Sequence, residues 1–374
     1  MLSDSVKGEG VRALTCVMYV GTYTGAKSEG VYAYTMDLSN GSFTPMGLVS
    51  KTPNPTFLDL DSKHGYLYAV NEIEQFEGKP AGAVSAFSID RTTGKLTLLN
   101  QRSSGGSGPC QITLDGKQKN VLVANYGGGS VAVLPIAKDG GLGEASIVIQ
   151  HQGKSVNPER QQGPRAHCMT VDAGSRFAFA CDLGMDKVVI YRLDSEKGTL
   201  APNEPAFVPV KPGAGPRHLT FSPNGRQAYL INELDSTVVV FGYDPIHGAL
   251  KELQTVSTLP TDFKATNYGA EIEVHASGKF LYASNRGHNS IAVFAIDPAK
   301  GTLTLVEHQS TQGKTPRHFS IDPTGRFLIA ANQDSDSLVV FGINLESGRL
   351  KPTGQVLKVG APVCVKFTPP GAIH

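Results

Sequence analysis

The stretch PRHLTFSPNGRQAYLINELDSTVVVFGYDPIHGALKEL, residues 216–253, contains the unit from which the whole chain is built. A first apolar strand runs from Pro216 to a turn at Gly225, and a second strand ends near Asn232. The β-branched run VVVF (238–241) is a third strand, and GALKEL begins a fourth after a polar turn. Glycine at such turns fits a backbone with positive φ. The stretch therefore predicts four consecutive antiparallel strands.

This unit recurs seven times along the chain. Short β-branched and aromatic runs mark the third strands, and in every copy a glycine follows the end of the run after seven residues. The runs are VYAY (31–34), VSAF (84–87), VAVL (131–134), VVIY (188–191), VVVF (238–241), IAVF (291–294) and LVVF (338–341). No stretch has a 3.6-residue apolar period of helical length. Seven such repeats predict an all-β fold, a seven-bladed β-propeller with four antiparallel strands per blade.

Each end of the chain lacks part of a unit. MYVGTYTG (18–25) is a second strand with no first strand before it, and PVCVKFTP (362–369) is a first strand with no second strand after it. Pairing of these N- and C-terminal strands closes the ring and removes open sheet edges. We therefore expect a polar N-terminal tail at 1–16, one propeller domain at 17–369 and a C-terminal tail at 370–374. A two-domain β protein is the competing fold, but the spacing shows no break at a linker.

Composition narrows the range of partners. The chain has 374 residues with 34 Lys and Arg against 33 Asp and Glu, a formal net charge of +1. This balance argues against a nucleic-acid or membrane-surface partner, and no apolar run is long enough for a membrane span. The five cysteines show no CxxC spacing and the N-terminal sequence does not resemble a secretory signal, so we expect a cytoplasmic protein with reduced thiols.

Polar side chains recur at two positions that antiparallel strands bring to the same end of a blade. The start of the inner strand, seven residues before the turn glycine, holds His167, His218, Glu271 and His318. The end of the second strand, eight residues after that glycine, holds Asp182, Glu233, Arg286 and Gln333, with Glu72 and Tyr126 in the first two repeats. The motifs PRAH and PRH add Arg165, Arg217 and Arg317. Because inner strands line the channel of a propeller, we expect these side chains around one mouth of it, with the loops 72–82, 150–163 and 258–269 as its rim.

Each of these residues also has a structural interpretation. A histidine at a strand start commonly serves as a hydrogen-bonding strut, and an arginine can link neighbouring blades. Function is favoured because both slots are polar in blade after blade while their identities differ. A structural slot repeats one residue, and we interpret Asn71, Asn125, Asn232, Asn285 and Asn332 in that way.

From residue 215 to 244 the sequence resembles the seven-bladed lactonase family that includes bacterial 6-phosphogluconolactonase and the fungal carboxy-muconate lactonizing enzyme. The resemblance extends from about residue 17 to 369 and is strong again in EVHASGKFLYASNRGHNSIAVF and PRHFSIDPTGRFLIAANQDSDSLVVF. It implicates a histidine, two arginines and a glutamate at the channel mouth. By motif these are His167 in GPRAHCM, Arg217 in GPRH, Glu233 in NEL and Arg286 in SNRGH. PRAH has one residue more than PRH, so a bulge displaces either Arg165 or His167.

The resemblance implies hydrolysis of 6-phosphogluconolactone in the pentose phosphate pathway, without a cofactor. Arg217 and Arg286 would then bind the anion and stabilise the oxyanion. His167 would act as general base, with Glu233 orienting it or carrying a proton to the ring oxygen. His218 is a second candidate base, and the base and acid roles are open to exchange. The remaining substrate-binding candidates are His218, Arg317, His318, Glu271, Asp182 and Tyr126.

Three alternatives stay open: a muconate-type cyclase, a lactonase for another sugar lactone, and a non-catalytic docking platform. A docking face favours exposed aromatic anchors, but the chain has no Trp and the mouth slots contain one aromatic residue, Tyr126. Neither GxSxG nor HExxH occurs, so we expect a water nucleophile and no metal ion. The expected partner is a small phosphorylated sugar lactone. The sequence does not indicate an oligomeric state.

Overall fold

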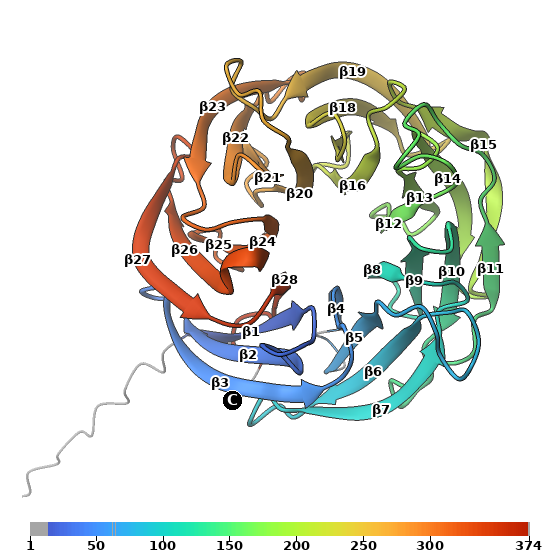
Figure 1. Ribbon diagram of the computed structural model, residues 1–374, viewed down its shortest axis with the longest axis horizontal. Helices are drawn as coiled ribbons and strands as arrows, with labels where there is room; N and C mark the ends of the chain where they lie inside the picture. The colour runs from blue at the N-terminus through green and yellow to red at the C-terminus, as the bar shows by residue number, and fades with distance from the viewer. Residues whose placement is uncertain (1–13, 62, 64, 373–374) are drawn as a thin grey trace, which may run out of the picture.

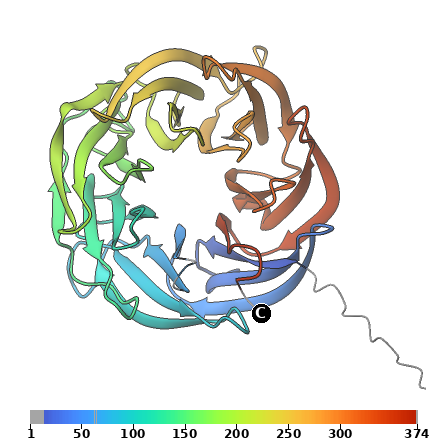
Figure 2. The ribbon, with the colours of Figure 1, turned by 180° about the vertical axis from the view of Figure 1, so that it is seen from behind.

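Alternating β-branched and aromatic residues form strands in every repeat, and their buried faces stack the sheets against one another. The computed structural model describes residues 14–61, 63 and 65–372, which form seven four-stranded antiparallel sheets arranged as a closed ring (Figure 1). The view from behind shows the same circular arrangement (Figure 2). The predicted all-β, seven-bladed propeller is confirmed.

The blades are numbered here along the chain, with the innermost strand first. Blade 1 contains β4 (Leu58–Asp61), β5 (Tyr66–Asn71), β6 (Ala83–Ile89) and β7 (Leu96–Ser103); blade 2 contains β8 (Pro109–Leu114), β9 (Asn120–Asn125), β10 (Ser130–Pro135) and β11 (Ile147–Gln150). Blade 3 contains β12 (Ala166–Val171), β13 (Phe177–Asp182), β14 (Lys187–Asp194) and β15 (Thr199–Pro209); blade 4 contains β16 (Pro216–Phe221), β17 (Gln227–Asn232), β18 (Thr237–Asp244) and β19 (Ala249–Ser257). Blade 5 contains β20 (Tyr268–Val274), β21 (Phe280–Arg286), β22 (Ser290–Ile296) and β23 (Leu303–Ser310); blade 6 contains β24 (Pro316–Ile321), β25 (Phe327–Asn332), β26 (Ser337–Ile343) and β27 (Leu350–Lys358).

Blade 7 closes the ring with strands from both ends of the chain: β28 (Pro362–Phe367), β1 (Thr15–Thr22), β2 (Gly30–Asp37) and β3 (Ser42–Lys51). β1 and β28 pair antiparallel, as predicted, with Val20 opposite Val365 (Figure 1). The predicted tail 1–16 lies mostly outside the described residues, and its last two residues already belong to β1.

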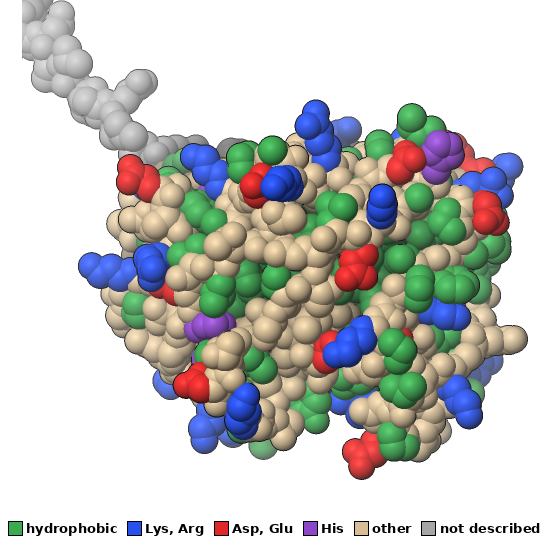
Figure 3. All heavy atoms as spheres, turned by 90° about the horizontal axis from the view of Figure 1, so that it is seen from above, with side chains coloured by type: hydrophobic (Ala, Val, Ile, Leu, Met, Phe, Trp, Pro, Cys, Tyr) green, Lys and Arg blue, Asp and Glu red, His purple; other side chains and the backbone are tan. Residues whose placement is uncertain are grey.

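Helix is almost absent from the described part of the chain. Its one helical element is the 3₁₀ turn η1 (Gln333–Ser335). None of its helices is long and apolar enough to cross a bilayer. Acidic and basic side chains are scattered among hydrophobic and other residues over the side of the ring that Figure 3 shows.

An extra residue near the start of the inner strand recurs around the ring. The register shifts between Pro109 and Gln111, between Ala166 and Cys168, between Pro216 and His218, and between Pro316 and His318. Such a bulge leaves its extra residue outside the ladder and redirects side chains. The seven inner strands surround the channel (Figure 1), so the bulges lie at its wall.

Buried tyrosines link neighbouring blades. The hydroxyls of Tyr229 and Tyr282, which are fully buried, donate to the turn carbonyls of Gly301 and Gly348 in the next blade, at 3.0 and 2.8 Å. Tyr19 and Tyr68 make the same contact with Gly94 and Gly140. The third-to-fourth-strand turn glycines are therefore also contact points between blades.

We expect Tyr229→Phe and Tyr282→Phe each to lower the free energy of unfolding by about 1–2 kcal/mol, because each leaves a buried carbonyl without its donor. Urea denaturation measures this. Tyr32→Phe is the control, since its hydroxyl lies at the surface, and should change stability by less than about 0.5 kcal/mol. Equal effects of the three substitutions would contradict the role of the buried contacts.

Candidate functional site

The turn between the first and second strands decides which residues reach the channel. In blades 4, 5 and 6 the left-handed turn residue is Gly225, Gly278 or Gly325, with φ of 67–72°. In blade 3 it is Ser175, with φ of 50°, and not Gly174. Counting from Ser175 shifts the register of blade 3 by one residue relative to the sequence prediction.

The shift changes the equivalences of two predicted site residues. His167 now corresponds to Arg217, since both are the extra residue of a bulge. Asp182 corresponds to Asn232, because Ala166 pairs with Asp182 as Pro216 pairs with Asn232. PRAH therefore aligns one residue later than PRH, and the bulge brings His167 to the mouth.

Asp182 is not on the wall of the channel mouth, where the sequence analysis expected it. It is fully buried, and its Oδ2 lies 2.6 Å from Nδ1 of His151. Its Oδ1 accepts hydrogen bonds from the backbone N–H groups of Arg165 and Met185. Asp182 thus has the structural role of the buried asparagines. Asn125 of blade 2, for example, donates to the carbonyl of Ser104, which follows the last strand of blade 1.

Bulge residues, second-strand ends and rim loops together enclose a cavity of about 230 Å³, called here the mouth cavity. Its wall is formed by Glu72, Cys110, Tyr126, Arg160, His167, Glu233, Tyr268, Arg286 and Arg317. These residues come from six of the seven blades and from the loops between strands. The structure thus brings together His167, Glu233, Arg286, Arg317, Tyr126 and Glu72, as predicted.

Glu233 is the centre of charge in this cavity. Its carboxylate accepts hydrogen bonds from Arg160 at 2.6 Å and Arg217 at 3.2 Å, and it forms an ion pair with Arg286 at 2.9 Å. Burial alone would raise the pKa of Glu233, but the three arginines outweigh burial and lower it to about 2. The carboxylate is therefore ionised at neutral pH and holds the arginines in place.

Arg217 lies behind Glu233 and does not form part of the cavity wall. Its side chain is 3% exposed, its Nε donates to Glu233, and its Nη1 donates to the carbonyl of Ala270 at 2.6 Å. Nη1 also lies 3.3 Å from Nε2 of His218. These contacts make Arg217 a support for Glu233.

Arg317 is the wall arginine that keeps its hydrogen-bonding capacity. Among the described residues its guanidinium has a cation–π contact with the Tyr23 ring, at 5.5 Å, but no hydrogen-bonded side-chain partner. Tyr23 donates to Glu72, which also accepts from Thr56. The three arginines and two glutamates of the wall carry a formal charge of +1, and Arg217 behind Glu233 raises the charge of the cluster to +2.

His167 is the buried imidazole of the mouth. Its Nε2 lies 3.9 Å from Glu233, and its Nδ1 lies 3.8 Å from Sγ of Cys110. Burial, followed by the charge of Arg217, lowers the pKa of His167 well below its usual range, so the ring is neutral. Burial also raises the pKa of Cys110, so its thiol stays protonated and does not supply a thiolate nucleophile.

His218, Glu271 and His318 lie one layer below the mouth rather than on its wall. Glu271 joins them, since its two oxygens lie 3.1 Å from Nδ1 of His218 and 3.2 Å from Nε2 of His318. The sequence analysis placed them at the mouth because it treated the bulge as a single position. In the bulged strand Arg217 and Arg317 take the mouth position, and the histidines follow beneath.

The contacts fix the tautomers of both histidines. Arg217 can only donate, so Nε2 of His218 accepts, and its Nδ1–H donates to Glu271. Nδ1 of His318 accepts from the Val365 backbone N–H, and burial lowers the pKa of His318 to about 3. Because Arg217 occupies the Nε2 lone pair of His218, His218 does not serve as a second base in this arrangement.

A second cavity of about 310 Å³, the lower cavity, lies beyond this histidine layer. Its polar lining includes Asp59, Glu273, Ser320 and Lys366. Glu273 accepts from the backbone N–H of Ile321, and burial raises its pKa to about 8. The carboxyl group of Glu273 is therefore mainly protonated at neutral pH.

Two further candidates lie off the mouth wall. Arg165 donates to the carbonyl of Gly127 and packs over the ring of Tyr126 at 5.5 Å. Gln333 is part of η1, and its amide nitrogen lies 3.2 Å from Asp334.

Sequence reasoning missed Tyr23, Cys110, Arg160 and Tyr268. Tyr23 follows β1 in the closing blade as Glu233 follows β17, so extending the repeat into blade 7 would have found it. Cys110 is the extra residue of the β8 bulge, and its turn residue is Gln118, with φ of 55°. Arg160 belongs to a lengthened loop that follows no repeat register, whereas Tyr268 begins β20, opposite Arg286, one residue before the position that proline holds in other blades.

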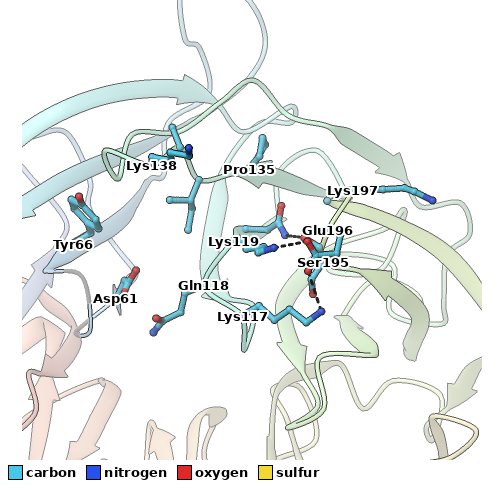
Figure 4. Close-up of a pocket in the computed structure, with 14 residues that line it drawn as sticks. Asp61, Tyr66, Lys117, Gln118, Lys119, Pro135, Lys138, Ser195, Glu196 and Lys197 are labelled. Carbon is cyan, nitrogen blue, oxygen red and sulfur yellow. Dashed lines mark hydrogen bonds and ion pairs between the residues drawn. The ribbon is translucent and has the colours of Figure 1, made fainter.

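Another cavity, of about 460 Å³, lies at the opposite end of the blades, at the first-to-second and third-to-fourth strand turns. Lysines dominate its rim, and Lys117 and Lys119 both contact Glu196 (Figure 4). These three side chains are about half exposed, and the two lysines form ion pairs with the glutamate. The mouth cavity, with its buried charges, is the stronger candidate site.

Fold and site define a seven-bladed propeller with a cationic, imidazole-containing cavity at one channel mouth. The family model described as "Lactonase, 7-bladed beta-propeller" matches residues 17–367. A 6-phosphogluconolactonase of Bacillus subtilis is 39% identical over 93% of this chain and 97% of its own. The chain belongs to the seven-bladed β-propeller lactonase family.

Solved structures agree with this assignment. A putative 6-phosphogluconolactonase from Bacteroides fragilis has a TM-score of 0.88 at 36% identity, covering 96% of this chain and 99% of its own. A periplasmic gluconolactonase from Pseudomonas aeruginosa has a TM-score of 0.89 at 37% identity, covering 95% and 99%.

Glu273 should make stability depend on pH. Its folded-state pKa of about 8 exceeds the ordinary 4.5, so the folded protein binds this proton more tightly and loses stability as pH rises from about 4.5 to 8. We expect Glu273→Gln to be more stable than wild type at pH 8 by at least about 1 kcal/mol, with the difference shrinking towards pH 5. Denaturation at both pH values measures this. A variant less stable than wild type at pH 8 would refute it.

Proposed function

We propose that this protein is a 6-phosphogluconolactonase, which hydrolyses 6-phosphoglucono-1,5-lactone to 6-phosphogluconate. The observation that carries the proposal is the net positive charge of the mouth cavity wall, with Arg217 behind it, beside the neutral imidazole of His167. The substrate is a dianionic phosphate ester that carries an electrophilic carbonyl. The positive charge suits its phosphate, and the neutral imidazole suits a base that activates water for attack on its carbonyl. The relative from Bacillus subtilis, named a 6-phosphogluconolactonase, supports the same reaction.

His167 is the general base of the proposed reaction. Its neutral ring takes a proton from water as the water oxygen attacks the lactone carbonyl carbon. The imidazolium then returns this proton to the ring oxygen as the carbon–oxygen bond breaks, which leaves a carboxylic acid that ionises in solution. One residue thus serves as base and then as acid, and no covalent intermediate is needed.

Arg317 and Arg286 supply the positive charge for the oxyanion. Arg317 has donors free to meet a developing negative charge, and both arginines contribute to the low pKa of His167. With a pKa of about 2, Glu233 suits the role of holding arginines rather than that of passing a proton. Arg217 fixes Glu233 from behind.

A lactonase acting on unphosphorylated sugar lactones is the second candidate, because one similar structure is named a gluconolactonase. Hydrolysis of 6-phosphogluconolactone and δ-gluconolactone, each corrected for spontaneous hydrolysis, distinguishes the two. A preference for the phosphorylated lactone supports the first function, and equal rates support the second.

The proposal includes a cytoplasmic location. All five cysteines are buried and unpaired, which suits a reducing compartment. Cell fractionation tests this directly.

We expect His167→Ala to lower kcat by about 10²–10⁴-fold through loss of general base catalysis, and Glu233→Gln to lower it by a similar factor as the arginines lose their anchor. Both variants should keep the fold by circular dichroism. Lys154→Ala, an exposed residue of the rim loop 150–163, should retain wild-type turnover. Full activity in both site variants would remove them from the mechanism.

The pH profile gives an independent check on His167. Because its pKa lies well below 6.5, the base stays unprotonated, and kcat/KM should not fall between pH 8 and pH 6.5 through its titration. Initial rates corrected for the uncatalysed reaction at each pH measure this. An acid limb centred near 6.5 would contradict the perturbed imidazole.

A further inference from the structure

The three arginines that contact Glu233 differ in depth. The Arg217 side chain is 3% exposed and that of Arg286 is 11% exposed, whereas that of Arg160 is 31% exposed. Arg160 also lines a neighbouring groove of about 410 Å³, which opens between the rim loops and shares Tyr268 with the mouth cavity. Arg160 therefore stands at the outer boundary of the mouth cavity, whereas His167 lies inside it.

The loop fixes Arg160 in this position before any ligand arrives. Gln161, which is fully buried, donates to the carbonyl of Leu183 and accepts from the N–H of Asn157. The Asn157 side chain accepts from the backbone N–H of Arg160 itself. Ser155 donates to Asp186 at 2.6 Å, which ties the loop to blade 3. Because the loop backbone is already ordered, little loop entropy is lost when the Arg160 side chain binds a ligand.

The Arg160 guanidinium can change partners at low cost. Its Nη2 donates to Glu233 and to the Tyr126 hydroxyl, at 2.6 and 3.1 Å, and it packs over the ring of Tyr268. If Arg160 turns to a ligand, Glu233 still keeps Arg217 and Arg286. A solvent-screened ion pair is also the weakest of the three to give up.

We propose that Arg160 binds the phosphate group of the substrate and so distinguishes phosphorylated from unphosphorylated lactones. The inference rests on the proposed function and assigns its substrate specificity. The phosphate is attached to the exocyclic carbon, outside the lactone ring. When the carbonyl lies near His167, the phosphate can therefore extend towards the outer boundary of the cavity, where Arg160 lies. A planar guanidinium donates two parallel hydrogen bonds to phosphate oxygens, and the open groove leaves the remaining oxygens hydrated.

The test compares Arg160→Gln with Arg165→Gln. Arg165 is a matched control, because it is also an arginine near Tyr126 but bonds to a backbone carbonyl outside the mouth cavity. We expect Arg160→Gln to raise KM for 6-phosphogluconolactone about tenfold or more, and to lower kcat/KM for this lactone about tenfold more than kcat/KM for δ-gluconolactone, because only the phosphorylated lactone loses a phosphate contact. Arg165→Gln should leave both substrates within about twofold.

Calorimetry with the products 6-phosphogluconate and gluconate separates this inference from the proposed function, because it requires no turnover. Loss of 6-phosphogluconate affinity in Arg160→Gln but not in Arg165→Gln supports the phosphate contact. Equal losses on both lactones, or an unchanged KM and unchanged 6-phosphogluconate affinity, overturn it. A wild-type enzyme that binds 6-phosphogluconate through Arg160 but does not hydrolyse the lactone refutes the proposed function and leaves the phosphate site standing.

Discussion

The antiparallel pairing of β1 with β28 is the constraint on which the rest of the structure depends. It joins the two ends of the chain in one sheet and fixes the blade number at seven, so that residues far apart in sequence face one axis. His167 and Arg317, which are 150 positions apart in the chain, meet on the wall of the same cavity for this reason. The mouth cavity therefore forms only when the ring is closed, because no single blade supplies its wall.

Within that ring, one carboxylate makes a concentrated positive charge tolerable. Four arginines at a narrow opening would repel one another in a poorly hydrated space. Glu233 contacts three of them, and the backbone carbonyl of Ala270 takes part of the remaining donor capacity. Arg317 is left with a tyrosine ring. The cavity is thus balanced enough to fold and cationic enough to attract an anion.

The sequence was sufficient for the fold, because spacing between strands and turn glycines repeats in every blade. It predicted the seven blades, the closure and most of the mouth wall. It failed where a local conformation broke the repeat: Ser175 took the left-handed position expected of Gly174, which moved Asp182 into the structural slot. It also could not separate the mouth from the histidine layer below, because a bulge is a backbone event that residue spacing does not show. Arg160 lies in an irregular loop, so only the folded structure shows that its side chain contacts Glu233 at the mouth cavity.

The bulges have a consequence for how such a protein can change over generations. A residue that lies outside the ladder carries no cross-strand pairing, so its replacement leaves the neighbouring rungs intact. Cys110, His167, Arg217 and Arg317 occupy such places, and they carry three different chemistries, a thiol, an imidazole and a guanidinium, at equivalent bulges. The side chains at the centre of the ring can therefore differ from blade to blade while the pairing of the strands that carry them stays the same.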